Sequence, residues 1–168
     1  GTLIDTDFRG AFAVDYGADL ATLVGGSGAN AFHAPDIVPV NLDENFGALW
    51  MDKTDKWPQL VMDLNRAASS SSPYDISGEL VVRGDIRSVR ADFKFFLREQ
   101  GDSTVLFTET VTGATVDAAP GNDVVWAFTG SFTTDVDTAL DLRLNWDEGT
   151  GGSDGGDMFL TQLTITEQ

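Results

Sequence analysis

The sequence contains no cysteine and a single histidine, His33, in 168 residues. Without cysteine there is no disulfide framework, no thiolate nucleophile and no Cys-ligated zinc. Catalytic triads that use histidine, and histidine-rich metal sites, would all depend on His33. This residue lies in the loop-like segment 31–35, and no GxSxG element occurs anywhere in the sequence. We therefore expect His33 to be a structural or surface residue.

Basic residues and long apolar runs are also scarce. Ten Lys and Arg are outnumbered by 27 Asp and Glu, which gives a net charge of −17 at pH 7. Such a field repels phosphate backbones and anionic lipids, so we expect no nucleic-acid partner and no membrane partner. No run approaches the ~18 apolar residues of a membrane span. No cationic, apolar leader precedes Gly1, and the acidity suits an extracellular setting, so we expect a mature or excised secreted chain.

The clearest positive pattern is the alternation of apolar and polar residues over 122–168. Period-two alternation interrupted by Gly, Asp and Thr turns is typical of antiparallel strands with one buried face. Trp146 stands at the end of its strand, so it either closes the barrel or lines the rim of a cleft. The side chains predicted to point inward are Val124, Trp126, Phe128, Phe132, Leu140, Leu142, Leu144, Trp146, Phe159, Leu163 and Ile165.

Similar strand patterns begin at Ala48, whereas residues 1–47 are less regular. Strands are predicted at 48–51, 57–64, 74–82, 89–97 and 104–111, with loops at 67–73 and 112–122. A short strand is expected near Leu3, and a helical turn or a strand at 18–24. About eight to ten strands with almost no helix and no linker predict one domain, residues 1–168. Its predicted fold is all-β, an antiparallel β-sandwich or jelly roll.

Five short motifs follow one another along this pattern. They are Thr6-Asp7-Phe8-Arg9, Lys56-Trp57-Pro58-Gln59-Leu60, Ser72-Pro73-Tyr74-Asp75-Ile76-Ser77-Gly78, Val125-Trp126-Ala127-Phe128 and Met158-Phe159-Leu160-Thr161-Gln162-Leu163-Thr164-Ile165. Their order resembles that of carbohydrate-binding modules of the families 4, 9, 16 and 22 type, chiefly over residues 56–168. The resemblance implies a galactose-binding-like jelly roll that binds glycan, with the Trp of the second motif in the glycan cleft.

The resemblance also implies a structural calcium ion, and two positions argue against it. In such modules an early Glu and a late Asp help to hold calcium, and the matching residues here are Arg9 and Thr161. A guanidinium cannot ligate a hard cation, so we expect no calcium at that place. The acidic glycine loop 147–157 leaves two alternatives, a calcium ion held by Asp147, Asp154 and Asp157 or a solvated hairpin loop. No cofactor is expected to be required.

Aromatic, amide and guanidinium side chains fall in the outward phase of several predicted strands. Such a set suits a glycan cleft, because a ring packs on sugar C–H groups while the polar groups bind vicinal hydroxyls. The structural alternatives are that Trp57 is a core or edge residue and that the cations only balance an acidic surface. The predicted ligand-binding residues are Trp57, Gln59, Phe96, Arg98, Arg143, Asn145 and Trp146.

The function expected from the sequence is non-catalytic carbohydrate binding that targets an attached enzyme or particle to a polysaccharide or oligosaccharide. The sequence gives no signal for a catalytic pair of carboxylates. With 27 acidic residues, some pair can always be selected, so the presence of such a pair indicates nothing. The partner could be a covalently attached catalytic domain. The alternative is a structural virion component, a capsid-decoration or fibre-tip domain, that forms a homo-oligomer. Its contact surface would be an outward apolar set of Val81, Phe96, Leu106 and Leu160.

Overall fold

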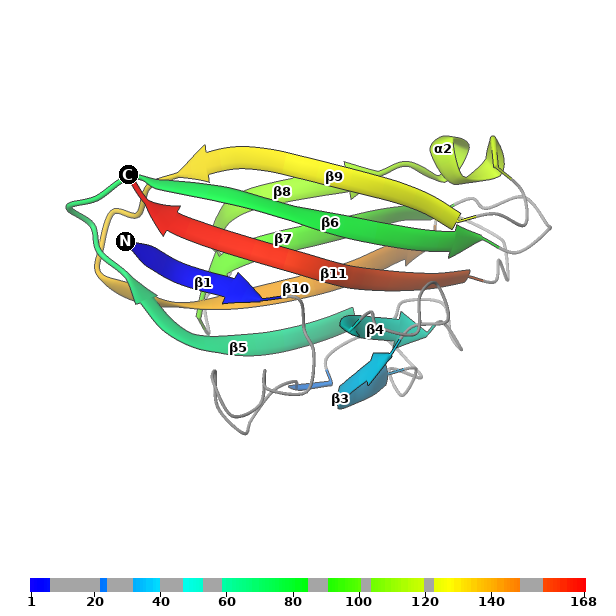
Figure 1. Cartoon of the computed structure of the whole chain (residues 1–168), viewed down its shortest axis with the longest axis horizontal. Helices are drawn as coiled ribbons and strands as arrows, with labels where there is room; N and C mark the ends of the chain where they lie inside the picture. The colour runs from blue at the N-terminus through cyan, green and yellow to red at the C-terminus, as the bar shows by residue number, and fades with distance from the viewer. Residues whose placement is uncertain are drawn as a thin grey trace.

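Two antiparallel sheets pack face to face in the computed structural model of the chain (Figure 1). The structure describes residues 1–6, 22–23, 32–39, 47–52, 59–84, 91–100, 104–119, 123–148 and 156–168. Within these ranges only the backbone is described for 22–23, 32–39, 47–52, 59–62, 65, 83–84, 91, 146–148 and 156–157. The all-β antiparallel sandwich predicted from the alternation is confirmed.

The first sheet has six strands and contains both ends of the chain. Its order is β3-β4-β11-β6-β9, and β1 also pairs with β11. The Glu167 amide donates to the Gly1 carbonyl at 3.0 Å, so the two termini lie together at one end of the sandwich (Figure 1). The strands are β1 (Thr2–Thr6), β3 (Phe32–Pro39), β4 (Gly47–Asp52), β6 (Tyr74–Gly84), β9 (Asp123–Phe132) and β11 (Gly156–Glu167).

The second sheet has five strands in the order β2-β5-β10-β7-β8. Because β5 and β7 flank β10, residues far apart in sequence lie side by side on this sheet. The strands are β2 (Thr22–Leu23), β5 (Gln59–Ala68), β7 (Ala91–Glu99), β8 (Val105–Val111) and β10 (Thr138–Glu148). The predicted strands at 57–64, 89–97 and 104–111 correspond to β5, β7 and β8, although Trp57 lies outside the described residues.

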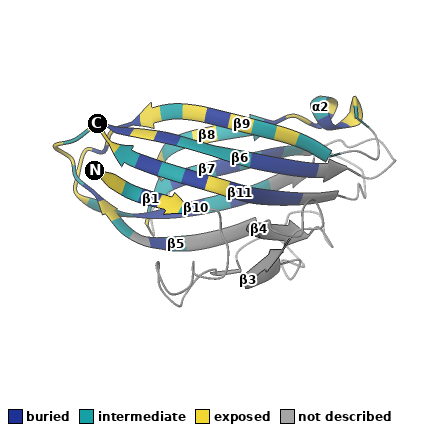
Figure 2. Ribbon diagram, viewed as in Figure 1, coloured by how far each residue is buried: buried dark blue, intermediate teal, exposed yellow. Residues whose placement is uncertain are grey.

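The core fills the space between the two sheets (Figure 2). Where side chains are described, buried and more exposed residues largely alternate along the strands, so about one side chain in two points toward the opposite sheet. A buried stack of aromatic rings crosses the interface: the centroid of Phe128 on β9 lies 5.2 Å from that of Phe95 on β7 and 5.7 Å from that of Phe107 on β8. At the edge, the Trp126 indole N–H donates to Glu109 Oε1 at 2.7 Å and links the two sheets again.

Gly78 on β6 lies against this stack, and Gly78→Ala is expected to destabilise the fold by about 1–3 kcal/mol. A Cβ here would lie 2.5 Å from Phe128 Cζ and 2.6 Å from the Gln162 carbonyl oxygen. The ring can shift, but the carbonyl belongs to the neighbouring strand and cannot move cheaply. Chemical denaturation should show the loss, and Ser77→Ala on the solvent side should stay within about 0.5 kcal/mol of the parent. A parent-like midpoint for Gly78→Ala would contradict this packing.

A β-bulge at Thr161 changes the phase of β11. Leu160 pairs with Leu80 while Gln162 pairs with Glu79, so Thr161 is the extra residue. Its hydroxyl lies 2.9 Å from Glu79 Oε1 and 3.2 Å from the Glu79 carbonyl oxygen. The prediction that Phe159 points inward with Leu163 is therefore wrong. Leu160 is in the core instead, and Phe159 is buried outside it.

Three other segments differ from the secondary structure predicted for them or are described only in part. His33 lies in strand β3 rather than in a loop. The predicted loop 112–122 contains a short helix, α2 (Gly113–Asp117), which begins after Thr112 because the Thr112 side chain accepts from the Thr115 amide. At 18–24 the described part is strand β2. The described residues include no helix that is long and apolar enough to cross a membrane.

The apolar surface expected for a self-associating virion component is not formed as predicted. Leu160 is fully buried in the core, Val81 is only 2 % exposed, and Leu106 packs against the core. Phe96 is half-buried on the outer face of the second sheet. These four residues therefore do not make one exposed apolar patch.

Candidate functional site

The candidate site is the outer face of the second sheet, formed by β5, β10 and β7. On β7 the side chains of Phe93, Phe95 and Leu97 are buried in the core, whereas those of Lys94, Phe96 and Arg98 alternate with them and are half-buried. On β10 the same alternation turns Arg143 and Asn145 outward on either side of the buried Leu144. The sequence prediction of an outward phase for these residues agrees with the structure.

Strand pairing brings the outward residues into rows across the sheet. Phe96 pairs with Arg143, and Lys94 pairs with Asn145. On the other side of β10, Asn145 pairs with Gln59 of β5. Since paired strands lie about 4.8 Å apart, these residues are direct neighbours although they come from three separate segments. We name this group, Gln59, Lys94, Phe96, Arg98, Arg143 and Asn145, the outer-face cluster.

The aromatic ring of Phe96 contacts the guanidinium of Arg143. The Arg143 guanidinium carbon lies 5.4 Å from the centroid of the Phe96 ring, within the range of a cation–π contact. One face of Phe96 is thus covered by Arg143. Phe96 therefore supports a guanidinium on one face, and its predicted contact with a ligand remains a prediction.

Arg98 is held by a residue that the sequence reasoning missed. Its Nε and Nη2 donate to the two carboxylate oxygens of Asp141 at 2.9 and 3.1 Å, the bidentate geometry of a strong ion pair. The Asp141 side chain is 2 % exposed and that of Arg98 is 14 % exposed. The sequence did carry a signal, because Asp141 occupies the outward phase of β10 between two core leucines.

Burial and a neighbouring cation lower the pKa of Arg143 below its usual value. Removal from water is the largest cause, repulsion by Arg98 is the second, and attraction to Asp141 opposes them. Arg143 remains a cation at neutral pH because an arginine pKa lies so far above 7. The Asp141 carboxylate thus acts on both guanidiniums: it binds Arg98 and attracts Arg143.

The side chains of three predicted ligand-binding residues lie outside the described part of the structure. Trp57 lies outside the described residues. Trp146 pairs with the core residue Phe93 through its backbone, which agrees with the inward phase predicted for it, but its side chain is not described. The backbone of Gln59 is described without its side chain. Ligand binding by these residues remains a prediction.

The predicted metal ligands lie at the ends of two strands in different sheets. Asp147 pairs with Asp92 near the end of β10, and Asp157 pairs with Asp52 and Arg83 near the start of β11. Asp154 lies between them, outside the described residues. No group of three His, Asp or Glu able to hold a metal occurs among the described side chains. The calcium prediction stays untested.

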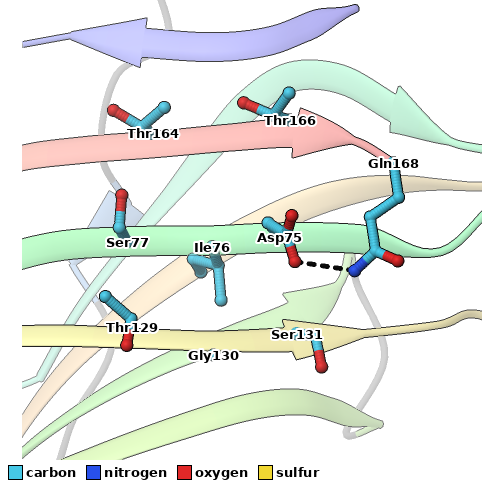
Figure 3. A pocket seen from close by; sticks show the side chains of 9 residues that line it. All are labelled: Asp75, Ile76, Ser77, Thr129, Gly130, Ser131, Thr164, Thr166 and Gln168. Atoms are coloured by element: carbon cyan, nitrogen blue, oxygen red, sulfur yellow. Dashed lines mark hydrogen bonds between the residues drawn. The ribbon is translucent and has the colours of Figure 1, made fainter.

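A hollow lies on the opposite side of the sandwich, over β6, β9 and β11 (Figure 3). It has a volume of about 450 Å³, and five of its nine lining residues carry a hydroxyl group. Gln168 Nε2 donates to Asp75 Oδ1 at 2.6 Å across one end. Its lining residues include no ring and no cation, so it offers hydrogen bonds without stacking or positive charge. They are Asp75, Ile76, Ser77, Thr129, Gly130, Ser131, Thr164, Thr166 and Gln168.

No protein-family model matches the sequence, and no curated protein matches it. Solved structures do share the fold. The K1 cleaved adhesin domain of Lys-gingipain from Porphyromonas gingivalis W83 is similar with a TM-score of 0.61 and 14 % identity, over 100 % of this chain and 99 % of that one. A xylan-binding module, CBM15, is similar with a TM-score of 0.51 and 15 % identity, over 99 % and 97 % of the two chains.

Enzymes and enzyme-attached modules share the same fold. The CBM22-1–GH10 modules of an endo-1,4-β-D-xylanase from Clostridium thermocellum, complexed with xylohexaose, match with a TM-score of 0.51 and 12 % identity; the similarity covers 100 % of this chain and 29 % of that one. A cyclase from Fischerella sp. TAU matches with a TM-score of 0.54 and 11 % identity over 98 % of both chains. At such low identity the likeness concerns the fold alone.

Proposed function

We propose that this domain binds polysaccharide non-covalently through the outer-face cluster. The proposal rests on the position of three outward residues from two adjacent strands. Arg143 and Asn145 lie two residues apart on β10, and Phe96 of β7 pairs with Arg143, so the three are neighbours on the sheet. An amide both donates and accepts hydrogen bonds, and a guanidinium donates up to five. Neighbouring groups of this kind match the vicinal hydroxyls of a sugar ring.

We infer that the cluster serves binding rather than turnover. Its groups are held in place before a ligand arrives, because Arg143 rests on Phe96 and Arg98 is fixed by Asp141. Pre-ordered side chains lower the entropy lost on binding, although a mobile sugar chain must still be ordered. Asp141, a carboxylate at the centre of the face, is engaged by Arg98. We therefore propose a binding module of modest affinity without catalytic activity.

The proposed setting is outside the cell, where the domain would hold an attached catalytic domain or a particle on a polysaccharide. The fold shared with a xylan-binding module and with a module of a xylanase supports this assignment. A cyclase shares the same fold, so the fold by itself does not select binding over turnover.

Asn145→Ala is expected to weaken polysaccharide retention at least tenfold, because it removes both hydrogen-bonding atoms at the centre of a row. Affinity electrophoresis through gels containing soluble xylans, glucans and mannans measures the retention. The thermal melt should change little, since Asn145 is half-buried on the solvent side. Trp57→Ala tests the sequence-based part of the site in the same gels and is expected to abolish retention.

Gln162→Ala is the matched control, because Gln162 is an exposed amide on the outer side of the first sheet. Its retention should equal that of the parent. If no polysaccharide retards the parent chain, the proposed function is wrong. A rise of reducing ends during incubation with a polysaccharide would identify an enzyme instead.

A further inference from the structure

Strand β9 forms one edge of the first sheet (Figure 1). All ten of its residues pair with β6 without a register shift, and no described strand pairs with its other side. Because successive residues of a strand direct their N–H and C=O groups to opposite sides, about half of these groups on β9 face away from β6. The outer side chains are exposed: Val125, Ala127, Thr129 and Ser131. This edge therefore offers a regular row of donors and acceptors to an added strand.

The other described edge strands carry features that discourage such pairing. Proteins protect a sheet edge by shortness, proline, an irregular register or an inward charge. Strands β1 and β2 have only five and two residues. Strand β3 contains Pro35 and Pro39. Strand β8 has a register shift, and its Glu109 carboxylate accepts from the indole of Trp126. Strand β9 has none of these features, since it lacks proline and no residue after Asp123 is charged.

The core is incompletely covered beside the same edge. Five apolar residues of the described structure pack against the core and stay partly exposed, and four of them lie on β8 and β9. A strand added next to β9 would direct every second side chain toward this margin and remove apolar surface from water, which is favourable. The five residues are Leu3, Leu106, Phe107, Val124 and Trp126.

The segment that contains both edge strands carries negative charge alone. Residues 99–142 include eight Asp and Glu and no Lys, Arg or His. The neighbouring strands do supply cations. Arg83 of β6 pairs with Asp123, whereas Lys94 and Arg98 of β7 lie beyond β8, where Arg98 already has a carboxylate partner. A chain with basic residues would therefore be attracted to this side of the sandwich, and an acidic chain would be repelled.

We propose that β9 pairs with an extended peptide segment of a partner protein, which has alternating apolar side chains and basic rather than acidic residues. The backbone of the segment bonds to the free edge of β9. Its apolar side chains cover Val124 and Trp126, and its basic groups meet the carboxylates of segment 99–142. This inference is independent of the proposed polysaccharide binding, which uses the outer face of the second sheet.

A second copy of this chain suits the edge less well. Each copy has a net charge of −17. Two β9 strands paired antiparallel about Phe128 would place Asp123 of each copy opposite Thr133 of the other and close to Asp135 of the other. Like charges would then meet at both ends of the strand, which is destabilising. The charges favour a different chain as the partner.

Hydrogen exchange followed by NMR, one amide at a time, tests the edge in the free protein. Every second amide of β9 should exchange at least tenfold faster than the amides bonded to β6. Uniformly slow exchange along β9 in dilute protein would show that the edge is already covered, and this would overturn the inference. Slow exchange that develops only as the protein concentration rises would identify a second copy as the partner and would overturn the peptide assignment.

A display library of random peptides, each long enough to pair along β9, supplies the probe. The selected peptides should alternate apolar with polar positions and should contain Lys or Arg rather than Asp or Glu. One synthesised peptide is then titrated by calorimetry, and at saturation it should slow the rapid amides of β9 at least tenfold. A library without any binder, or a peptide that protects only amides outside β9, contradicts the proposal.

Ala127→Lys should weaken the binding of that peptide at least tenfold, because a cation at the edge repels a basic strand. Gln162→Lys is the matched control. Ala127, Glu79 and Gln162 form one row across β9, β6 and β11, so the control adds the same charge two strands away from the edge. Both substituted residues are exposed, and both variants should melt like the parent.

Equal affinities of the two lysine variants for the peptide, whether reduced or unchanged, would show that β9 is not the strand that pairs. Neither variant should alter retention in polysaccharide gels, because neither residue lies on the second sheet. A negative result with peptides therefore leaves the proposed function standing, and a failure of polysaccharide binding leaves the peptide site standing.

Discussion

Asp141→Asn is expected to lower the free energy of unfolding by about 3–5 kcal/mol, the cost typical of removing one partner of a buried ion pair. The Asp141 side chain is 2 % exposed and binds Arg98 through both oxygens. Asparagine has nearly the same shape, so the substitution removes charge rather than volume. It leaves the Arg98 and Arg143 guanidiniums without the carboxylate that offsets their repulsion. Urea denaturation monitored by tryptophan fluorescence measures the loss.

A double-mutant cycle separates the pair from the rest of its surroundings. Arg98→Gln alone should also destabilise the fold, because it leaves the Asp141 carboxylate buried without that partner. The double variant should be more stable than the sum of the single losses indicates, by at least about 1 kcal/mol. Strictly additive losses would show that Arg98 and Asp141 do not stabilise each other.

The sequence predicted the sheet faces well because alternation is a local property. On β7 the inward set and the outward set both follow from counting every second residue, and the structure agrees with each of them. The prediction failed at Phe159, where the bulge at Thr161 inserts one residue and reverses the phase of β11. A bulge depends on the partner strand, here on Glu79 and its contacts with Thr161, so alternation alone could not reveal it.

The candidate site was predictable residue by residue but not as an arrangement. Arg98 and Arg143 were both expected to point outward, yet their partners depend on which strands are neighbours. The order β5-β10-β7 joins segments about 45 and 80 residues apart, and nothing local encodes it. Hence the sequence reasoning missed Asp141 and also the contact between Phe96 and Arg143.

Phe95→Ala and Phe96→Ala form a matched pair, because adjacent residues of one strand point to opposite faces of the sheet. Phe95 is fully buried and stacks with Phe128 at 5.2 Å, so its truncation is expected to cost about 3–5 kcal/mol. Phe96 is half-buried under Arg143, and its truncation should cost about 1 kcal/mol, close to the value of the lost cation–π contact. Thermal and chemical denaturation of both variants measures the difference.

The affinity for polysaccharide should be reduced more by Phe96→Ala than by Phe95→Ala, the opposite of the order expected for stability. Phe96→Ala removes the support of the Arg143 guanidinium, which should then sample more orientations and lose affinity for polysaccharide. Phe95→Ala touches no outward group, so the molecules that remain folded below its melting temperature should bind as the parent does. Affinity measured well below both melting temperatures separates these effects. The opposite result, with parent-like binding by Phe96→Ala and weakened binding by Phe95→Ala, would contradict this site. The ligand would then not bind on the outer face of β5, β10 and β7, because Phe95 points into the core and away from that face.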